Sequence, residues 1–236
     1  MTSQCPVEVR AADKTFGSSP ALRGVTLKVD QGEVALVVGH NGSGKSTLVR
    51  ILAGLSSVSA GEVLLFGQPA SKLQPRHRRR VGVVAHQSFL YPKLTARENL
   101  EFYADLYRLE HRANNVSKLL ERTGLGKVAD ERVCTFSRGM EQRLALARAA
   151  IGTPDVLLMD EPFAALDIDG VELASGLIEE AGARGCAVVI TAHEPFQLAR
   201  LAFTSYALVR GRLRAAPSYL DERGASRGFL KSAAGG

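Results

Sequence analysis

Residues 34–47 read VALVVGHNGSGKST, a run of five apolar residues followed by a glycine-rich turn that ends in Gly44, Lys45 and Ser46. Apolar residues at helical spacing follow, from Leu48 to Leu55. The pattern therefore predicts a strand, a phosphate-binding loop and a helix. A glycine-rich turn that matches by chance is the alternative. It is disfavoured because the apolar strand and the helix lie where such a loop requires them.

The predicted loop offers several kinds of group to a phosphate. Gly39, Gly42 and Gly44 let the backbone turn so that successive N–H groups point at phosphate oxygens, where side chains would block the approach. Lys45 adds a positive charge, Ser46 offers a hydroxyl to Mg²⁺, and the helix N-terminus adds a partial positive charge. We therefore expect the loop to bind a nucleoside triphosphate.

Length and composition describe an ordinary folded protein. The 236 residues suffice for one α/β domain, with or without an inserted lobe, but not for two such domains. Hydrophobic residues make up 45% of the chain and the net charge is +6, which excludes a disordered chain and does not by itself indicate nucleic acid. Residues 201–236 carry six basic side chains against two acidic ones, a local charge of +4 that favours a solvated surface over contact with anionic lipid. Residues 224–236 are rich in Gly, Ala and Ser and are expected to be disordered.

The cysteines and the hydropathy pattern restrict the cellular setting. Cys5, Cys134 and Cys186 are widely spaced and lack metal-ligand companions, so they are predicted to be reduced cytosolic thiols. No apolar run approaches ~18 residues, and no charged-then-apolar leader begins the chain. Neither a membrane span nor secretion is predicted.

An antiparallel region is predicted ahead of the phosphate loop, because residues 7–29 alternate apolar and polar side chains. Phe16 lies at a turn in this region. Its ring either stacks on a flat adenine or packs in the core, and the sequence favours neither.

A mostly helical lobe is predicted for residues 92–152. Thr95 and Glu98 have the spacing of a capping box, and a further helix is expected to begin at Arg138. The basic stretch at residues 74–80, just before the lobe, is interpreted first as a solvated edge and second as a contact for an acidic partner.

Two carboxylates directly follow the apolar residues 156–159. Asp160 and Glu161 would be costly at the end of a buried strand unless they faced a cation or a reaction site. Asp160 is predicted to hold Mg²⁺ or its water near Ser46, and Glu161 to polarise the water that attacks the γ-phosphate. An acidic turn without a catalytic role is the alternative, which the phosphate loop upstream disfavours.

Two more polar residues follow short apolar runs, Gln87 after residues 81–85 and His193 after residues 186–190. Ligands collect beyond the carboxyl ends of parallel strands, so Gln87 is expected at a ligand. A lone histidine is more often structural. As the third polar group at such a strand end, after Gln87 and Glu161, His193 is expected to contact the γ-phosphate.

Six motifs in this order resemble those of the ATP-binding cassette family: GHNGSGKST at Gly39, Gln87, FSRGMEQR at Phe136, VLLMDEP at Val156, AALD at Ala164 and TAH ending at His193. The resemblance covers residues 7–214. It implies an α/β fold, a P-loop NTPase with a mainly parallel core sheet, an N-terminal antiparallel β-subdomain and an inserted helical lobe. It also implies a single nucleotide-binding domain over residues 1–223.

By that resemblance the chain binds ATP and Mg²⁺ and hydrolyses ATP. Catalysis would fall to Glu161, His193 and Gln87, and Mg²⁺ would be held by Ser46, Gln87 and Asp160. In the family the signature motif binds the γ-phosphate of an opposite subunit, and here Ser137 and Gly139 match it. The other nucleotide contacts implied by the motifs are Phe16, Gly39, Asn41, Gly42, Ser43, Gly44, Lys45, Ser46, Thr47 and Asp167.

The resemblance also implies partners. If another subunit's signature loop completes the ATP site, ATP binding closes a homodimer or a pair with a homologous ATPase subunit. Such a motor would act on integral membrane permease subunits at the cytoplasmic face of the cell membrane, and no nucleic acid is expected. Non-transport cassette ATPases are disfavoured because the chain has neither a long coiled-coil insertion nor a second cassette. Small-molecule kinases are disfavoured because they do not use a signature loop or His193.

The signature motif departs from the common LSGGQ form at Phe136, Arg138 and Met140. Such variants resemble those of type 2 exporters. A cation at a helix N-terminus is disfavoured by ~0.3–1 kcal/mol unless an anion approaches. We therefore expect Arg138 to face bound nucleotide or an acidic partner surface.

Residues 86–109 resemble the ATPase subunit of the heme exporters used in cytochrome c maturation. This narrower resemblance implies heme export, with drug, lipid or polysaccharide export by another type 2 exporter as the alternative. The aromatic residues of the segment are interpreted one by one as lobe core. They are Phe89, Tyr91, Phe102, Tyr103 and Tyr107.

Overall fold

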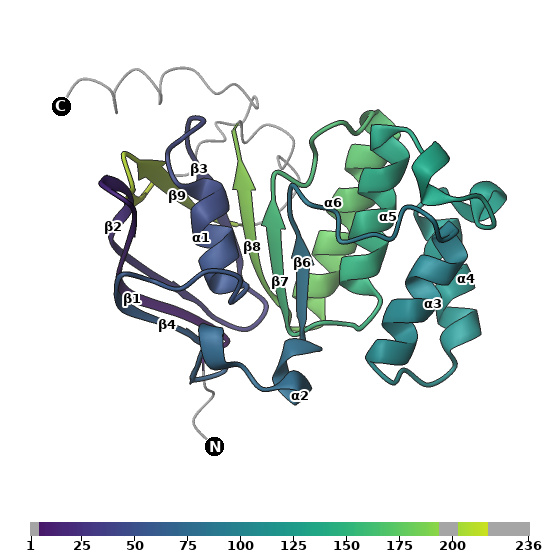
Figure 1. The fold of residues 1–236 in the computed structure, drawn as a ribbon, viewed down its shortest axis with the longest axis horizontal. Coiled ribbons are helices and arrows are strands. Elements are labelled where there is room, and N and C mark those ends of the chain that lie inside the picture. The colour runs from purple at the N-terminus through teal and green to yellow at the C-terminus, as the bar shows by residue number, and fades with distance from the viewer. Residues whose placement is uncertain (1–4, 194–202, 217–236) are drawn as a thin grey trace.

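Two β-sheets organise the chain, of which the computed structural model describes residues 5–193 and 203–216 (Figure 1). The larger sheet has the strand order β10-β9-β3-β8-β7-β6, parallel except for the antiparallel pair β9–β10. The smaller sheet is antiparallel, in the order β2-β1-β4-β5. The strands are β1 (Val7–Phe16), β2 (Ser19–Val29), β3 (Val34–Val38), β4 (Ala60–Leu65), β5 (Gln68–Pro69), β6 (Val81–Val84), β7 (Val156–Asp160), β8 (Ala187–Ala192), β9 (Thr204–Val209) and β10 (Arg212–Ala215).

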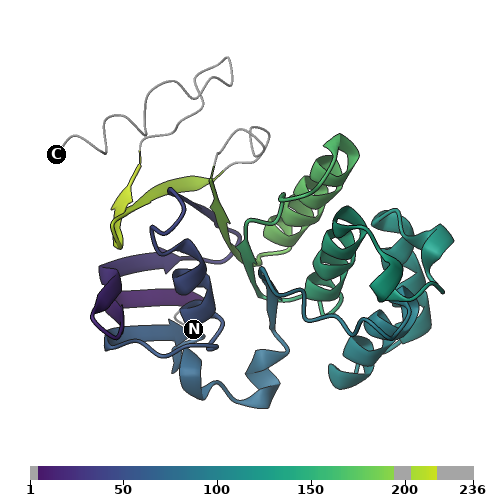
Figure 2. The same cartoon turned by 45° about the horizontal axis from the view of Figure 1, so that its top comes forward.

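Helices cover both faces of the larger sheet (Figures 1 and 2). Helix α1 packs with the smaller sheet on one face, and α5 and α6 pack on the other. The α-helices are α1 (Lys45–Leu52), α2 (Pro75–Arg78), α3 (Ala96–Leu106), α4 (Arg112–Arg122), α5 (Arg138–Ala150) and α6 (Ile168–Ala183). Short 3₁₀ turns are η1 (Ala70–Lys72), η2 (Gly126–Val128) and η3 (Val133–Thr135).

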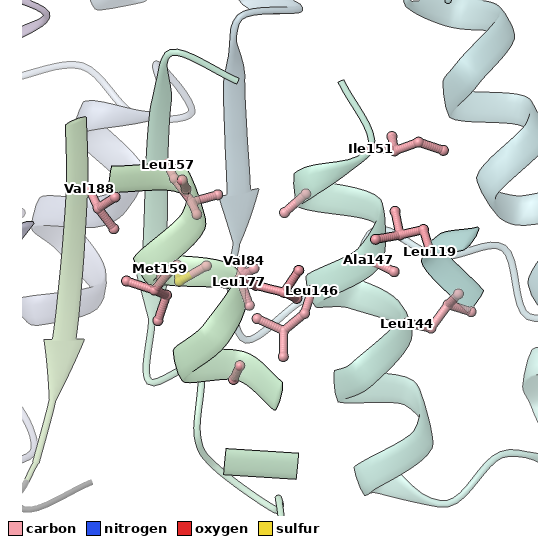
Figure 3. Close-up of a cluster of buried hydrophobic side chains, with 14 of the residues drawn as sticks. Val84, Leu119, Leu144, Leu146, Ala147, Ile151, Leu157, Met159, Leu177 and Val188 are labelled. Carbon is pink, nitrogen blue, oxygen red and sulfur yellow. The ribbon is translucent and has the colours of Figure 1, made fainter. Parts of the chain in front are cut away.

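The central strands are buried on both faces, as the apolar runs in the sequence predict. All five side chains of β3 are buried, and successive residues point to opposite faces. Leu36 therefore joins the core beside α5 and α6, whereas Val37 joins the core beside α1. Figure 3 shows the first of these cores, in which Met159 from the sheet lies among side chains such as Leu146 and Leu177 of the covering helices. The predicted α/β fold with a mainly parallel sheet is confirmed.

The helical lobe consists of α3, α4 and α5, inserted between β6 and β7. At the start of α3, Thr95 Oγ1 accepts from the Glu98 N–H at 3.1 Å, and a Glu98 carboxylate oxygen accepts from the Thr95 N–H at 2.8 Å. The predicted capping box is thus confirmed. Helix α5 begins at Arg138, as predicted, with Ser137 as its N-cap.

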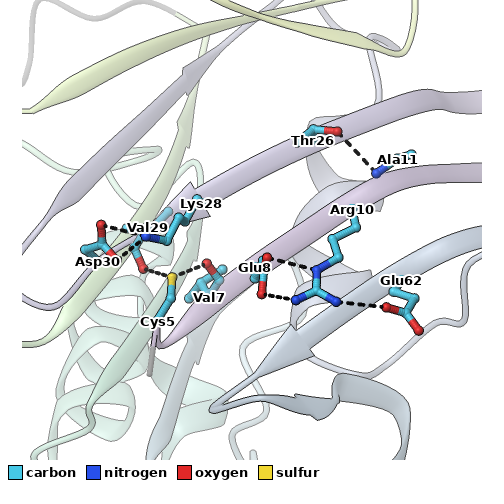
Figure 4. Close-up of polar contacts among 10 residues, drawn as sticks. All are labelled: Cys5, Val7, Glu8, Arg10, Ala11, Thr26, Lys28, Val29, Asp30 and Glu62. Carbon is cyan, nitrogen blue, oxygen red and sulfur yellow. Dashed lines mark hydrogen bonds and ion pairs between the residues drawn. The ribbon is translucent and has the colours of Figure 1, made fainter. Parts of the chain in front are cut away.

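The antiparallel sheet predicted in the N-terminal region is also present, and polar contacts hold its outer face (Figure 4). Arg10 on β1 pairs with Glu8 on the same strand at 2.9 Å and with Glu62 on β4 at 3.4 Å. The Cys5 thiol donates to the carbonyl oxygens of Val7 and Val29, and burial raises its pKa. The contacts with Glu62 and Val29 join segments that are distant in the sequence.

Two aromatic residues do not match their interpretation as lobe core. Tyr91 and Phe102 are 46% and 41% exposed, with their rings in edge contact at 4.9 Å between centroids. The interpretation is wrong for this pair because α3 buries Leu100 and Ala104 on one face and leaves Phe102 outside that face. The remaining three, Phe89, Tyr103 and Tyr107, are partly buried.

The basic stretch at residues 74–80 forms α2, which has no buried residue. Arg80 pairs with Asp155 at 2.5 Å and lies over the Phe66 ring at 4.2 Å. The predicted tail at residues 224–236 lies outside the described residues, as does the end of the domain predicted over residues 1–223. In the described part of the chain, each helix is too short or too polar to cross a bilayer.

Candidate functional site

The phosphate loop connects β3 to α1 in a conformation that requires glycine. Gly42 and Gly44 have φ of +78° and +109°, in the left-handed region that favours glycine. A side chain at Gly39 or Gly44 would also collide, because a Cβ there would lie 2.5 Å from the carbonyl oxygen of Leu208 or Ala21. The loop is thus held closely against β9 and β2. The Ser43 hydroxyl is buried and has no hydrogen-bond partner within the described residues, as expected of a group that waits for a ligand.

Lys45 is the first residue of α1, and only 4% of it is exposed. Its Nζ donates to the carbonyl oxygens of Gly39 at 2.7 Å and His40 at 3.3 Å. The same ammonium lies 3.2 Å from Glu161 Oε1, whose side chain is 42% exposed. The loop therefore folds around its own cation and joins it to the carboxylate that follows β7.

The two carboxylates after β7 differ in their surroundings. Asp160 is the last residue of β7 and is 9% exposed, and its Oδ1 accepts from the Thr191 hydroxyl at 2.6 Å. Glu161 follows with φ of +50°, a strained conformation for a non-glycine residue. Its N–H donates to the carbonyl and hydroxyl oxygens of Thr191 at 3.0 and 3.2 Å. Thr191 on β8 thus holds both residues in place.

A cavity of about 490 Å³ lies beside these groups. Asn41 and Ser46 line it from the phosphate loop, Asp160 and Glu161 from the end of β7, and Arg138 from the start of α5. Three segments far apart in the sequence thus converge on one space. The expectation that Arg138 faces nucleotide stays a prediction, but its side chain does border the same cavity as Ser46.

Gln87 and His193 lie at the same edge of the larger sheet. Gln87 is exposed between His86 and Ser88, which both line the cavity. His193 is exposed just after β8, and its ring meets the ring of His40 in the phosphate loop edge-on, with 5.9 Å between centroids.

The two residues predicted to contact a second subunit and the predicted nucleotide contact Asp167 lie at the start of two helices. The Ser137 hydroxyl accepts from the Met140 N–H at 3.2 Å, and Gly139 lies so close to Ala165 that a Cβ would be 3.1 Å from its carbonyl oxygen. Asp167 caps α6 by accepting from the Gly170 N–H at 2.9 Å. Ser137 and Gly139 thus belong to the start of α5, in the helical lobe, and Asp167 to the start of α6.

Phe16 ends β1 and is 54% exposed, so the alternative of a core residue is wrong. Lys14 Nζ lies over the ring at 4.9 Å from its centroid. An exposed aromatic ring is what adenine stacking requires, and that role stays a prediction.

Four residues near these groups were missed by the sequence reasoning: His40, Arg143, Arg148 and Thr191. Arg143 pairs with Asp167. The hydrogen bond from the Gly170 N–H and then the one from Arg143 keep the Asp167 pKa below its usual value. Arg148 is 4% exposed within a run of buried residues on α5. A single charge inside an all-apolar helical run is a readable signal, whereas the contact of Thr191 with Asp160 depends on strand register and leaves none.

Comparison with known proteins identifies the family. A family model described as ABC transporter matches residues 22–164 of the chain. The chain belongs to the ABC transporter family. Its ATPase class is consistent with one structural neighbour, a dimeric ATP-binding cassette in a post-hydrolysis state bound to ADP and Pi. That cassette has a TM-score of 0.77 and 28% identity, covering 94% of this ABC ATPase and 100% of the neighbour.

Curated relatives of this ABC ATPase have different stated roles. It is 40% identical to the uncharacterized ABC transporter ATP-binding protein YbbA of Escherichia coli K12, covering 91% of this chain and 99% of that protein. It is 35% identical to the Nod factor export ATP-binding protein I of Burkholderia lata, over 88% and 69% of the two chains. It is also 35% identical to the cytochrome c biogenesis ATP-binding export protein CcmA of Haemophilus influenzae, over 75% and 84%.

Proposed function

We propose that this ABC ATPase powers a membrane exporter by closing on ATP and reopening after hydrolysis. The observation that carries the proposal is the buried Lys45, held by loop carbonyls and by Glu161 at one edge of the cavity. Two relatives named for export, each 35% identical, support the export class.

The described residues fit a nucleotide with Mg²⁺. Loop N–H groups and Lys45 suit phosphate oxygens, and Ser46 and Asp160 bring a hydroxyl and a carboxylate to one cavity, the oxygen ligands that Mg²⁺ prefers. Gln87 is proposed as a further oxygen ligand. When bound, Mg²⁺ would neutralise charge on the outer phosphates. Thr191 would hold the Asp160 carboxylate in place, because its hydroxyl donates a hydrogen bond to it.

Hydrolysis is assigned to Glu161, with His193 and Gln87 as supporting groups. Glu161 would accept a hydrogen bond from the attacking water, while Lys45 would exchange its contact with Glu161 for phosphate oxygens. The strained backbone at Glu161, anchored on Thr191, would hold the carboxylate in place for that task. His193 would contact the γ-phosphate.

The active unit is proposed to be a homodimer or a pair with a homologous ATPase subunit. Ser137 and Gly139 would bind the ATP of the opposite subunit, and Asp167 would lie at the same junction. The dimeric state of the similar cassette supports this arrangement. The partners would be integral membrane permease subunits, which would hold the chain at the cytoplasmic face of the cell membrane. Residues 1–223 are proposed to form a single nucleotide-binding domain.

The exported substrate is proposed to be heme for cytochrome c biogenesis. Two observations support this proposal: residues 86–109 resemble the ATPase subunit of heme exporters, and the chain is 35% identical to the CcmA relative. Export of another substrate by a type 2 exporter is the second candidate, which the Nod factor export relative favours at the same identity.

The variant Glu161→Gln tests the catalytic assignment. The side chain keeps its size and loses the carboxylate that accepts the water's proton, so ATPase turnover should fall by about 10²–10⁴-fold while ATP binding persists. Light scattering with ATP should show a dimer that no longer dissociates. Glu179→Gln, at an exposed position on α6, is the matched control and should keep turnover. Normal turnover in Glu161→Gln would overturn the assignment.

Deletion of the gene in its host separates the two substrates. If the exporter carries heme, covalently bound heme should disappear from c-type cytochromes on gels stained for heme peroxidase activity, and the intact gene should restore it. The Lys45→Ala variant should fail to restore it. Unchanged cytochromes would exclude heme and leave the second candidate.

A further inference from the structure

Arg148 is an arginine that the proposed mechanism does not use. It lies near the C-terminal end of α5 and is only 4% exposed. Its Nη2 donates to the carbonyl oxygens of Val83 at 2.5 Å and Ser88 at 3.2 Å. Its Nε is buried and has no hydrogen-bond partner within the described residues. Burial lowers the pKa of the guanidinium, which still remains charged at neutral pH.

The two carbonyl groups bound by Arg148 lie on either side of Gln87. Val83 belongs to β6, and Ser88 directly follows Gln87. One guanidinium nitrogen therefore joins the strand to the far side of the loop that carries Gln87. This contact fixes the distance between the two sides of the loop, because the carbonyl oxygens of Val83 and Ser88 both accept from Arg148 Nη2.

Other side chains of the helical lobe hold the same loop. The Arg148 guanidinium lies 5.5 Å from the ring centroids of Phe89 and Tyr103. The Tyr103 hydroxyl donates to the Phe89 carbonyl oxygen at 2.5 Å, where Phe89 has φ of +56°. The Ser88 hydroxyl donates to Glu141 on α5 at 2.7 Å. The loop thus moves with α3 and α5 if the lobe moves.

A purely structural role does not account for an arginine at this position. Burying a guanidinium is costly, and well-packed apolar residues of similar volume often stabilise a core as well or better. Leu144, Leu146 and Ala147, on the same helix, show that this part of α5 is otherwise apolar. Arginine offers something that leucine or methionine would not, namely a planar donor that binds two carbonyl groups at once.

We propose that Arg148 is a positioning residue that couples Gln87 to the signature end of α5. Helix α5 is capped by Ser137, which is proposed to bind the opposite subunit's ATP, and it holds the Gln87 loop through Arg148 near its other end. When Ser137 binds the opposite subunit's ATP, α5 would move as a rigid helix and carry the Gln87 loop with it. This inference rests on the proposed role of Gln87 in hydrolysis.

A double-mutant cycle with Gln87 tests the coupling. The Arg148→Met variant removes the donor and keeps apolar volume, and kcat of the purified chain should fall on the order of 10–100-fold through misplacement of Gln87. Affinity for a fluorescent ATP analogue should stay within about twofold, because the phosphate loop is not altered. In the Gln87→Ala background, Arg148→Met should lower kcat no further.

Controls separate folding from positioning. Arg112→Met, at an exposed arginine of the same lobe, should leave kcat unchanged. If Arg148→Met does not fold, Arg148→Lys carries the test: it keeps the charge but not the planar donor, so it should lower kcat when Gln87 is present and leave kcat unchanged in Gln87→Ala. Equal losses of kcat in both backgrounds would overturn the coupling and leave the proposed function intact. An unchanged kcat in Gln87→Ala alone would instead overturn the role of Gln87, and the coupling with it.

Discussion

Lys45 in the phosphate loop and Arg148 in the helical lobe are each 4% exposed, and both donate to backbone carbonyl oxygens. Their remaining contacts differ. Lys45 also meets Glu161, a carboxylate that borders the cavity, whereas Arg148 lies over two aromatic rings with no carboxylate in contact among the described residues. A buried cation with an exchangeable partner is suited to a ligand, and one enclosed by carbonyls and rings is suited to holding the backbone.

The phosphate-loop region and the helical lobe are expected to fold as one unit. Leu48 on α1 and Leu146 on α5 are both fully buried, on opposite faces of the larger sheet. Either Leu→Ala variant should lower the free energy of unfolding by ~2–5 kcal/mol through lost burial and the cavity left behind. Urea titration followed by circular dichroism should show one transition for each, while Leu106→Ala, at a 60% exposed site, should change little. Two separate transitions would show that the lobe and the core are distinct units.

Loss of the Lys45 charge should affect ligand binding rather than folding. A hydrogen bond to a charged group contributes ~1.5–3 kcal/mol, so Lys45→Met should weaken binding of a fluorescent ATP analogue by roughly 10–100-fold. Lys118→Met on α4 is the exposed control. Arg148→Met in the same titration should bind as the parent does, and equal weakening by both substitutions would erase the distinction between the two cations.

The sequence predicts the region around Lys45 well because its information is local. The apolar run of β3, the glycines with positive φ and the start of α1 are adjacent in the chain, so the loop needs no distant partner to be recognised. The capping box of α3 is local in the same way. Strands β6, β7 and β8 are likewise recognisable from their apolar composition.

The region around Arg148 was not predictable because its contacts are long-range. Nothing near Arg148 in the sequence indicates Val83 or Ser88, and the hydrogen bond of Thr191 to Asp160 depends on the register of two strands. The interpretation of Tyr91 and Phe102 as core residues was wrong for a related reason. Aromatic side chains occur both in cores and at surfaces, and only the packing of the folded chain decides between them.

Phe16 gives a smaller effect on the ligand side of the comparison. Stacking of an aromatic pair contributes ~0.5–1.5 kcal/mol beyond burial, so Phe16→Ala should weaken binding of ATP by roughly 2–10-fold and leave Arg148-dependent turnover unaffected once ATP is saturating. Phe16→Trp should retain most of the affinity, which isothermal titration calorimetry can measure. Equal affinity of the alanine variant and the parent for ATP would show that Phe16 does not contact the nucleotide.

The smallest effect is expected at the ion pair between Arg143 on α5, in the helical lobe, and Asp167 at the start of α6. The Gly170 N–H and then Arg143 hold the Asp167 pKa below its usual value in the folded chain. The stability that the carboxylate contributes is therefore fully present above the unfolded pKa of about 4 and is lost as pH falls through the lower folded pKa. Asparagine also caps helices well, so Asp167→Asn should remove mainly the charge contribution. Its melting temperature should lie slightly below that of the parent at pH 7, and the gap should narrow as pH falls below about 4, towards the lowered folded pKa. Asp169→Asn, two residues further on in the first turn of α6, controls for the loss of a surface charge. A gap that stays constant across this range would mean that the ion pair and the cap charge contribute nothing, and that α5 and α6 are held together by packing alone.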